Sequence, residues 1–293
     1  MSEKETFFLD TNVLIKWIYR KLLNEIPDIE RFINSLNKEQ CIILDIVLSE
    51  FEAIINYAYT MMSYIIYEKI LRESNWDKLS IEEKYQILDN IRKNFTNIYE
   101  ELRQKYYNGQ ILPHGIRQIL AKTLLTNMND KILSWSSEEL KRHIILSGRV
   151  DDLIDYITSI EYKIGQRCII YEVSNLSLKG NIIIDLQLID EGIRNYLNKL
   201  KKEEYRKTPS RNDQLIFKLL FSLLYERIYD KIIFITDDND FERMYREILS
   251  HLSKIINNKA DSYRSLKEHA KETYDILSKQ LILKRVNELR VNE

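Results

Sequence analysis

The sequence contains little glycine and proline, the two residues that most often interrupt helices and form tight turns. Only 6 glycines and 3 prolines occur in 293 residues. Ile, Leu, Lys, Glu and Tyr recur throughout, which favours long helices with few tight turns. The hydrophobic content of 44% is enough to fill a sizeable core. We therefore expect a helix-rich globular fold.

Cysteine and histidine, which bind zinc in many proteins, are also scarce. The 2 cysteines, Cys41 and Cys168, lie far apart in apolar runs without CxxC spacing. We expect them to be reduced core residues, with a disulfide disfavoured. The 4 histidines show no mutual spacing typical of metal ligands. A zinc site is therefore disfavoured, and any bound metal would have to be held by oxygen ligands.

Long apolar runs are absent as well. No stretch of about 18 or more uncharged apolar residues occurs, and Met1 to Asp10 is too short and too acidic for a signal peptide. We therefore expect a cytoplasmic protein with no membrane segment. The formal net charge of -1 gives no overall attraction to a polyanion, so nucleic-acid binding must rely on a local basic patch.

One basic patch lies between residues 199 and 211, close to the acidic motifs described below. Side chains of this kind bind phosphate groups, which gives salt-sensitive affinity with little sequence selectivity. A solvated helix end is an equally good interpretation of the same residues. The candidate nucleic-acid-binding residues are Lys201, Lys202, Arg206, Lys207 and Arg211.

Short β-branched runs stand out from the helical background and predict buried strands. They lie at residues 6–9, 41–44, 181–184 and 231–236, and the run at 168–173 is a further candidate. Helical patterns separate them, at residues 13–21, 47–67, 187–202 and 214–227. This alternation predicts an α/β fold with a parallel sheet, in a Rossmann-like, three-layer arrangement.

Two segments fall outside this alternation. Residues 68–165 contain no convincing strand and are rich in charge, which indicates a helical insertion into a core formed by residues 1–67 and 166–250. Residues 251–293 have a helical pattern and would form a C-terminal tail. Either the insertion or the tail could bind a protein partner or a second copy of the chain.

Acidic and polar side chains gather where the predicted strands end. They are Asp10, Thr11 and Asn12 after the first strand, Glu50 on the helix after the second, Asp213 at the start of a later helix, and Thr236, Asp237, Asp238 and Asp240 after the last strand. Because the carboxyl ends of parallel strands line a common crevice, we expect these acids to meet there. Their mutual repulsion would favour a divalent cation, and hard oxygen ligands suit Mg²⁺ or Mn²⁺.

Each acid also has a purely structural interpretation. Asp10 and Asp240 suit helix N-caps, Asp213 would be favoured by the dipole at a helix start, and Glu50 suits a solvated helix surface. Asp237 and Asp238 are common turn formers. The conjunction of these acids at one edge of the sheet favours a site over four separate structural roles.

At these residues the chain resembles the PIN family of nucleases. LeuAspThrAsnValLeuIle at 9–15 resembles the opening motif of that family, and IleValLeuSerGluPheGlu at 46–52 resembles its glutamate-bearing helix. ArgAsnAspGlnLeuIle at 211–216 resembles the third motif, and PheIleThrAspAspAsnAspPhe at 234–241 resembles the last. The motifs occur in the family's order. The segment at 68–165 and the long tail are absent from compact members.

By position, the resemblance implies a set of catalytic, metal-binding acids: Asp10, Glu50, Asp213 and Asp238, with Asp240 as an additional ligand. Thr11, Asn12, Thr236 and Asp237 would orient these acids. Asp238 is preferred to Asp237 because the family spacing places the ligand two residues after Thr236. The implied reaction is in-line attack by a metal-bound water on a phosphodiester, most naturally in single-stranded RNA and alternatively in DNA, with endonucleolytic cleavage by a two-metal type of site.

Two other functions are compatible with the same residues. A haloacid-dehalogenase-like phosphohydrolase also has an aspartate after its first strand, but that family requires Asp-x-Asp, and here Asn12 stands where the general acid would be. The second alternative is a PIN scaffold that has lost activity and binds RNA or a partner protein.

Overall fold

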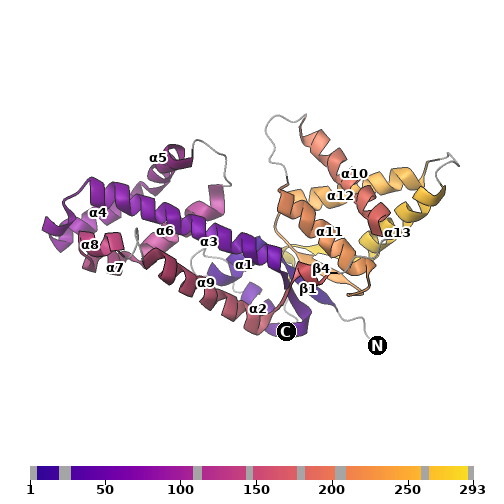
Figure 1. Ribbon diagram of the computed structural model, residues 1–293, viewed down its shortest axis with the longest axis horizontal. Helices are drawn as coiled ribbons and strands as arrows, with labels where there is room; N and C mark the ends of the chain where they lie inside the picture. The colour runs from indigo at the N-terminus through magenta and orange to yellow at the C-terminus, as the bar shows by residue number, and fades with distance from the viewer. Residues whose placement is uncertain are drawn as a thin grey trace. The chain divides into compact units, whose positions relative to one another are not determined.

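The described strands form one five-stranded sheet in which every pairing is parallel, and two of these strands are labelled in Figure 1. The computed structural model describes residues 5–19, 28–107, 114–142, 148–176, 182–201, 209–258 and 264–289. The strands are β1 (Thr6–Leu9), β2 (Cys41–Leu44), β3 (Ile169–Tyr171), β4 (Ile232–Ile235) and β5 (Leu281–Lys284), in the spatial order β3-β2-β1-β4-β5. Every residue of β1, β2 and β4 is buried, as expected for strands covered on both faces.

The chain divides into two compact units. The first comprises residues 1–49 and 164–293 and contains the sheet, and the second comprises residues 50–163. The second unit begins within α3 (Asp45–Ile66), earlier than the start of the expected insertion at residue 68.

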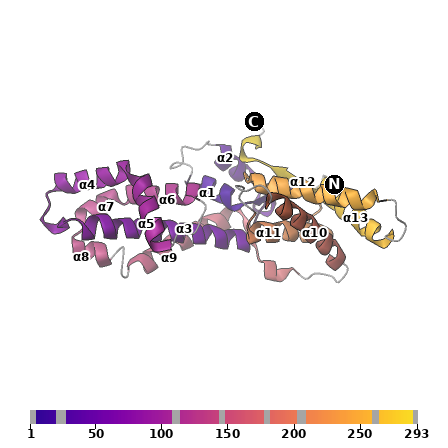
Figure 2. The same cartoon turned by 90° about the horizontal axis from the view of Figure 1, so that it is seen from above.

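The helices of the first unit are α1 (Thr11–Tyr19), α2 (Asp28–Ser35), α10 (Ile182–Leu200), α11 (Arg211–Tyr225), α12 (Asn239–Ile256) and α13 (Arg264–Gln280). Short 3₁₀ turns are η1 (Lys38–Gln40), η5 (Val173–Asn175) and η7 (Val286–Glu288). Helix α12 packs against α10 and α13 (Figure 2). The predicted α/β class with a parallel sheet is therefore confirmed, and the arrangement is compatible with a three-layer core.

The predicted strand at 181–184 is wrong, because Ile182 is the first residue of helix α10. Ile182 is buried, whereas Ile183 and Ile184 are 57% and 39% exposed. The buried face continues through Asp185, Leu188 and Ile189, which is helical spacing. A three-residue apolar run cannot by itself distinguish a strand from a buried helix start. Asn181 lies outside the described residues.

The predicted helical tail is also wrong in part. Residues 281–284 form strand β5, which pairs with β4 in the register Ile235↔Lys284. This pairing supplies backbone hydrogen bonds that a helix would make locally, so tertiary context decides the conformation of a short apolar run. The candidate strand at 168–173 is confirmed as β3, which lies at the other edge of the sheet.

The expectation of two reduced cysteines is wrong, because Cys41 and Cys168 form a disulfide. Strands β2 and β3 pair in the register Ile42↔Ile169. Cys41 and Cys168 each precede one residue of this pair, so they lie side by side, with a Cα–Cα distance of 4.6 Å. Both side chains are fully buried. The sequence could not reveal this contact, since it depends on the pairing of two strands that are far apart in the chain.

Gly192 allows the close approach of α10 to α12. A Cβ atom at this position would lie 3.0 Å from the Cα atom and 3.0 Å from the Cγ1 atom of Ile248. We expect Gly192→Ala to lower the free energy of unfolding by about 1–3 kcal/mol, as overpacking does, despite the better helix propensity of alanine. Gly165→Ala is the matched control, because nothing lies within 4 Å of its added Cβ atom. Urea unfolding should show Gly165→Ala equal to the wild type or more stable, and equal stability of the two variants would contradict the prediction.

The described residues of the second unit form helices joined by short turns, with no strand among them. Helix α3 continues into η2 (Tyr67–Arg72), a π-helical turn, and is followed by η3 (Trp76–Lys78), α4 (Ile81–Lys93), α5 (Phe95–Tyr107), α6 (His114–Asn127), α7 (Asn129–Ser134), α8 (Ser137–Leu140) and α9 (Gly148–Arg167). The prediction of a helix-rich segment is confirmed for these residues. Among the helices that are described in either unit, none is both long and apolar enough to cross a membrane.

A buried carboxylate connects η2 to α5 in the second unit. Glu68 is 6% exposed and accepts hydrogen bonds from Lys105 Nζ (2.7 Å), Arg72 Nη1 (2.9 Å) and the hydroxyl of Tyr106. These donors, Lys105 foremost, lower the pKa of Glu68 from 4.5 to about 2. A carboxyl group whose pKa is lowered by folding stabilises the fold above pH 4.5, and this stabilisation is lost as the pH falls toward 2.

We expect Glu68→Gln to lower the free energy of unfolding by about 1.5–3 kcal/mol at pH 7, the range for hydrogen bonds to a charged group. The difference between variant and wild type should shrink as the pH falls from 4.5 to about 2. Urea unfolding across this pH range measures it. Glu82→Gln, an exposed position on α4, is the control and should match the wild type. A difference that stays constant with pH would contradict the assignment.

Candidate functional site

Asp10 lies at the carboxyl end of β1, where α1 begins. Its backbone N–H donates to the carbonyl of Ile235 (3.0 Å), which extends the β1–β4 ladder by one bond. The side chain is only 7% exposed. Its carboxylate accepts hydrogen bonds from the backbone N–H of Thr11 (2.8 Å), from Asn12 Nδ2 (3.3 Å) and from Thr236 Oγ1 (2.7 Å). A buried carboxylate with three donors is held in one orientation.

Thr236 connects Asp10 to Asp238. While its hydroxyl donates to Asp10, its Oγ1 accepts from the backbone N–H of Asp238 (3.0 Å). The Oδ1 atom of Asp238 in turn accepts from the N–H of Asp240 (2.7 Å) and caps α12. The Oδ2 atom of Asp238 has no hydrogen-bond partner among the described residues. Two predicted site acids are therefore joined through one threonine.

The position of this pair in the sheet is informative. β1 has β2 on one side and β4 on the other, so the strand order reverses between β1 and β4. In open parallel sheets, ligands bind outside the carboxyl ends of the strands at such a switch point. Asp10 follows β1 and Asp238 follows β4, so the predicted convergence of these two acids is found in the structure.

Asp237 has a different set of contacts from Asp238. Its Oδ2 atom lies 3.2 Å from Lys16 Nζ on α1, and its Oδ1 atom accepts from the N–H of Val286 (3.1 Å). Asp237 thus connects the end of β4 to α1 and to the segment after β5. This engagement favours Asp238 as the acid that faces a ligand.

The remaining predicted acids have local roles in the structure. Asp213 is the third residue of α11 and forms a capping box with Ser210, whose N–H donates to Asp213 Oδ2 (2.6 Å). Asp240 lies 3.7 Å from Arg243 Nη1 and accepts a long hydrogen bond from the hydroxyl of Tyr196 (3.4 Å). Burial, and then the charge of Asp240, raise the pKa of Tyr196. Glu50 is a half-buried residue of α3 in the second unit.

Thr11 and Asn12 contact Asp10 in different ways. Thr11 donates through its backbone N–H, and its hydroxyl lies 3.5 Å from the carbonyl oxygen of Val47. Asn12 donates through its side-chain amide. The expected orienting role is therefore seen for the side chains of Asn12 and Thr236, while Thr11 acts through its backbone.

The donor set at Asp10 and Asp238 fits a hard divalent cation. Mg²⁺ is usually held by one or two carboxylates and completes its shell with water and substrate phosphate oxygens. Among the residues that the structure describes, no group of three or more His, Cys, Asp or Glu side chains is close enough to hold a metal ion. A cation held by these two carboxylates would therefore take its other ligands from water and the substrate.

The basic patch falls largely outside the described residues, which exclude Lys202, Arg206 and Lys207. Lys201 and Arg211 are described and exposed. Lys199, at the end of α10, pairs with Glu247 of α12 (2.6 Å). The role of the patch in phosphate binding stays a prediction.

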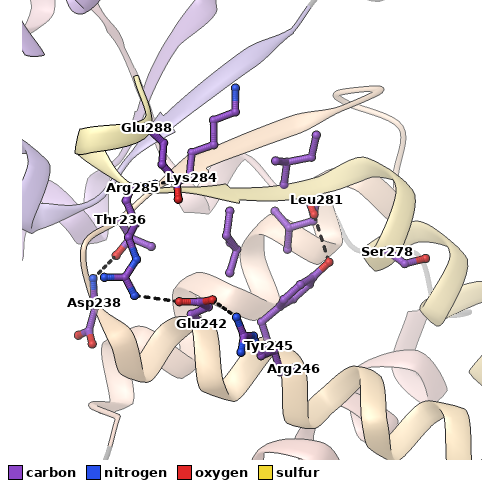
Figure 3. Close-up of a pocket in the computed structure, with 12 residues that line it drawn as sticks. Thr236, Asp238, Glu242, Tyr245, Arg246, Ser278, Leu281, Lys284, Arg285 and Glu288 are labelled. Atoms are coloured by element: carbon purple, nitrogen blue, oxygen red, sulfur yellow. Dashed lines mark hydrogen bonds and ion pairs between the residues drawn. The ribbon is translucent and has the colours of Figure 1, made fainter. Parts of the chain in front are cut away.

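A cavity of about 390 Å³ opens beside the acid pair (Figure 3). Thr236 and Asp238 form one end of it, and the rest is contributed by α12, the end of α13, β5 and the turn that follows. Its other lining residues are Glu242, Tyr245, Arg246, Ser278, Leu281, Ile282, Leu283, Lys284, Arg285 and Glu288. The sequence interpretation missed this wall, because residues 281–284 were expected to be helical.

An ion-pair network forms the polar wall of this cavity. Glu242 Oε2 lies 2.9 Å from Arg285 Nη2, and Glu242 Oε1 contacts Arg246 Nη2. The guanidinium of Arg285, followed by that of Arg246, lowers the pKa of Glu242. Arg285 also donates to Asn239 at the start of α12. The segment after β5 is thus bound to the residues that immediately follow Asp238.

Comparison with known proteins does not assign the chain to a family. No family model matches the chain, and no curated protein or solved structure is significantly similar to it.

Proposed function

We propose that this protein is a nuclease that depends on Mg²⁺ or Mn²⁺ and hydrolyses phosphodiester bonds, with single-stranded RNA as the main substrate. The observation that carries the proposal is the position of Asp10 and Asp238, which are connected by hydrogen bonds through Thr236, at the switch point of a parallel sheet. The resemblance of four motifs to the PIN family supplies the reaction class. We extend that resemblance to the fold and treat the sheet-containing unit as a PIN-like core.

Asp10 and Asp238 would hold the cation, and Thr236 would keep their separation fixed. A divalent ion bound there would activate a water and neutralise charge on the phosphate. Asp10 is buried, and three hydrogen-bond donors hold its carboxylate in one orientation. The resemblance also assigns ligand roles to Asp213 and Asp240, and these roles stay part of the proposal because the structure shows both acids in local contacts.

A phosphohydrolase with Asp10 as a nucleophile is the second candidate. The position of Asp10 after the first strand is common to both proposals. The side chain of Asn12 donates to Asp10 and has no acidic proton to give to a leaving group, which favours attack by water. Trapping of a covalent phosphoryl group on Asp10 would favour the phosphohydrolase.

The direct test is a cleavage assay with the purified full chain. Single-stranded RNA, single-stranded DNA and duplex RNA are incubated with Mg²⁺, Mn²⁺, Ca²⁺ or EDTA, and the product ends are mapped. We expect cleavage of single-stranded RNA with Mn²⁺ or Mg²⁺, none with EDTA, and products with 5′-phosphate and 3′-hydroxyl ends. Cleavage that persists in EDTA, or ends with 2′,3′-cyclic phosphate, would contradict a mechanism that uses metal-bound water.

A further inference from the structure

The cavity beside Asp238 has one apolar side and one charged side. Leu281 and Leu283 stand two residues apart on β5, so their side chains share one face of the strand, and both line the cavity together with Tyr245 of α12. The side chain of Lys284, in contrast, extends away from the other lining side chains (Figure 3). The apolar lining thus comprises Leu281, Ile282, Leu283 and the ring of Tyr245.

The hydroxyl of Tyr245 is already engaged within the protein. It donates toward the carbonyl oxygens of Leu277 (3.0 Å) and Leu281 (3.2 Å), which join α12 to the end of α13 and the start of β5. These bonds fix the phenol at one end, so the ring is a rigid wall. A rigid aromatic face with aliphatic neighbours suits a planar, apolar group such as a nucleobase.

The charged wall of the cavity carries the guanidinium groups of Arg285 and Arg246 together with acidic side chains. Arg285 and Arg246 both pair with the carboxylate of Glu242, and the carboxylates of Asp238 and Glu288 also line the cavity. Guanidinium groups bind phosphate oxygens with well-defined geometry. The wall therefore suits an anionic group at the end of the cavity where Asp238 also lies.

The size and position of the cavity also fit a nucleotide. A volume of about 390 Å³ lies within the range of about 300–1,000 Å³ that is usual for small-molecule sites. The cavity is continuous with Thr236 and Asp238, where the proposed function places the phosphate that is cut. A nucleotide in this cavity would be the neighbour of that phosphate along the strand.

We propose that this cavity binds one nucleotide of the substrate strand. The base lies against Leu281, Leu283 and Tyr245, and its phosphate lies toward Arg285. This inference rests on the proposed nuclease function for the identity of the strand. The binding of a mononucleotide, however, can be measured without catalysis.

The test is calorimetric titration of the full chain in EDTA with adenosine 5′-monophosphate, uridine 5′-monophosphate and ribose 5-phosphate. Stacking on one aromatic face predicts that at least one mononucleotide binds about 5- to 100-fold more tightly than ribose 5-phosphate, which lacks a base. Leu283→Trp fills the cavity and should abolish this preference. Ile228→Trp is the matched control and should keep the preference, because Ile228 is exposed and lies before the amino end of β4, whereas Asp238 follows its carboxyl end.

A second measurement keeps the proposal testable if Leu283→Trp does not fold. Wild-type protein is photo-crosslinked with 8-azidoadenosine 5′-monophosphate, and the modified peptides are identified by mass spectrometry. Crosslinks in residues 281–288 or at Tyr245 support the proposal. Equal affinity for ribose 5-phosphate and the mononucleotides, loss of the preference in both variants, or crosslinks confined to other segments would overturn it. Since no metal or turnover is involved, these outcomes are separate from failure of the cleavage assay.

Discussion

Asp10→Asn is expected to lower Mn²⁺-dependent RNA cleavage on the order of 10³-fold, the scale of losing a main electrostatic group at a reaction centre. Asparagine has nearly the same shape, so the packing around this buried position is preserved. It carries no charge, however, and presents one acceptor oxygen where Asp10 uses both of its oxygens for three donors. The cation would lose a charged ligand, and at least one of the three donors would lose its acceptor.

The comparison needs variants that separate the site from the fold. Asp238→Asn should cause a loss of similar size, because Asp238, whose backbone N–H donates to Thr236, supplies the other carboxylate of the proposed site. Asp230→Asn is the matched control, since Asp230 is exposed and precedes β4 at the amino edge of the sheet. It should cleave RNA like the wild type. Undiminished cleavage by both site variants would mean that the activity belongs to another site or to a contaminant.

Metal binding gives a readout that does not depend on turnover. Mn²⁺ that binds the native state should raise the melting temperature of the wild type and of Asp230→Asn, and it should have little effect on Asp10→Asn. The melting temperatures in EDTA show whether each variant is folded. A rise of equal size in all three proteins would place the Mn²⁺ site away from Asp10.

Loss of the disulfide is expected to have the largest effect on stability. The bond joins residues that are 127 positions apart, and a link of this length restricts the unfolded chain strongly. Removal should lower the free energy of unfolding by about 2–5 kcal/mol. The double variant Cys41→Ala/Cys168→Ala, compared with the wild type in urea, measures the difference.

Reductant supplies the control for this comparison. Because both cysteines are fully buried, reduction proceeds through the unfolded state, and equilibrium unfolding with reductant should shift the wild-type midpoint to lower urea. The double variant should not respond to reductant. Coincident wild-type curves with and without reductant would show that the bond contributes nothing to stability.

Much of the site could be predicted because its chemistry follows strand ends. The runs at 6–9 and 231–236 are apolar on every residue, which identified β1 and β4, and the acids directly after them had to lie at one edge of a parallel sheet. Thr236 was expected to orient the acids, and its hydroxyl does so. The choice of Asp238 over Asp237 agrees with the contacts of Asp237 to Lys16 and Val286.

Other features of the site depend on contacts that a local pattern does not contain. Asp213 has the spacing of an acid in a motif and also that of a capping box with Ser210, and the structure shows the capping box. The wall formed by Arg285 and Leu283 was missed because β5 exists through its pairing with β4. The same residues in isolation carry an equally good helical pattern.

By itself, the sequence determined the α/β class, the positions of β1, β2 and β4, the helical nature of the segment after α3, and the placement of Asp10 and Asp238 at strand ends. Only the tertiary structure decided the start of α10 at Ile182, the strand β5, the disulfide between β2 and β3, and the cavity beside Asp238. The reason is physical. Hydrophobic periodicity records which face of a segment is buried, whereas strand pairing and register depend on the partner that buries it, and that partner lies far away in the chain.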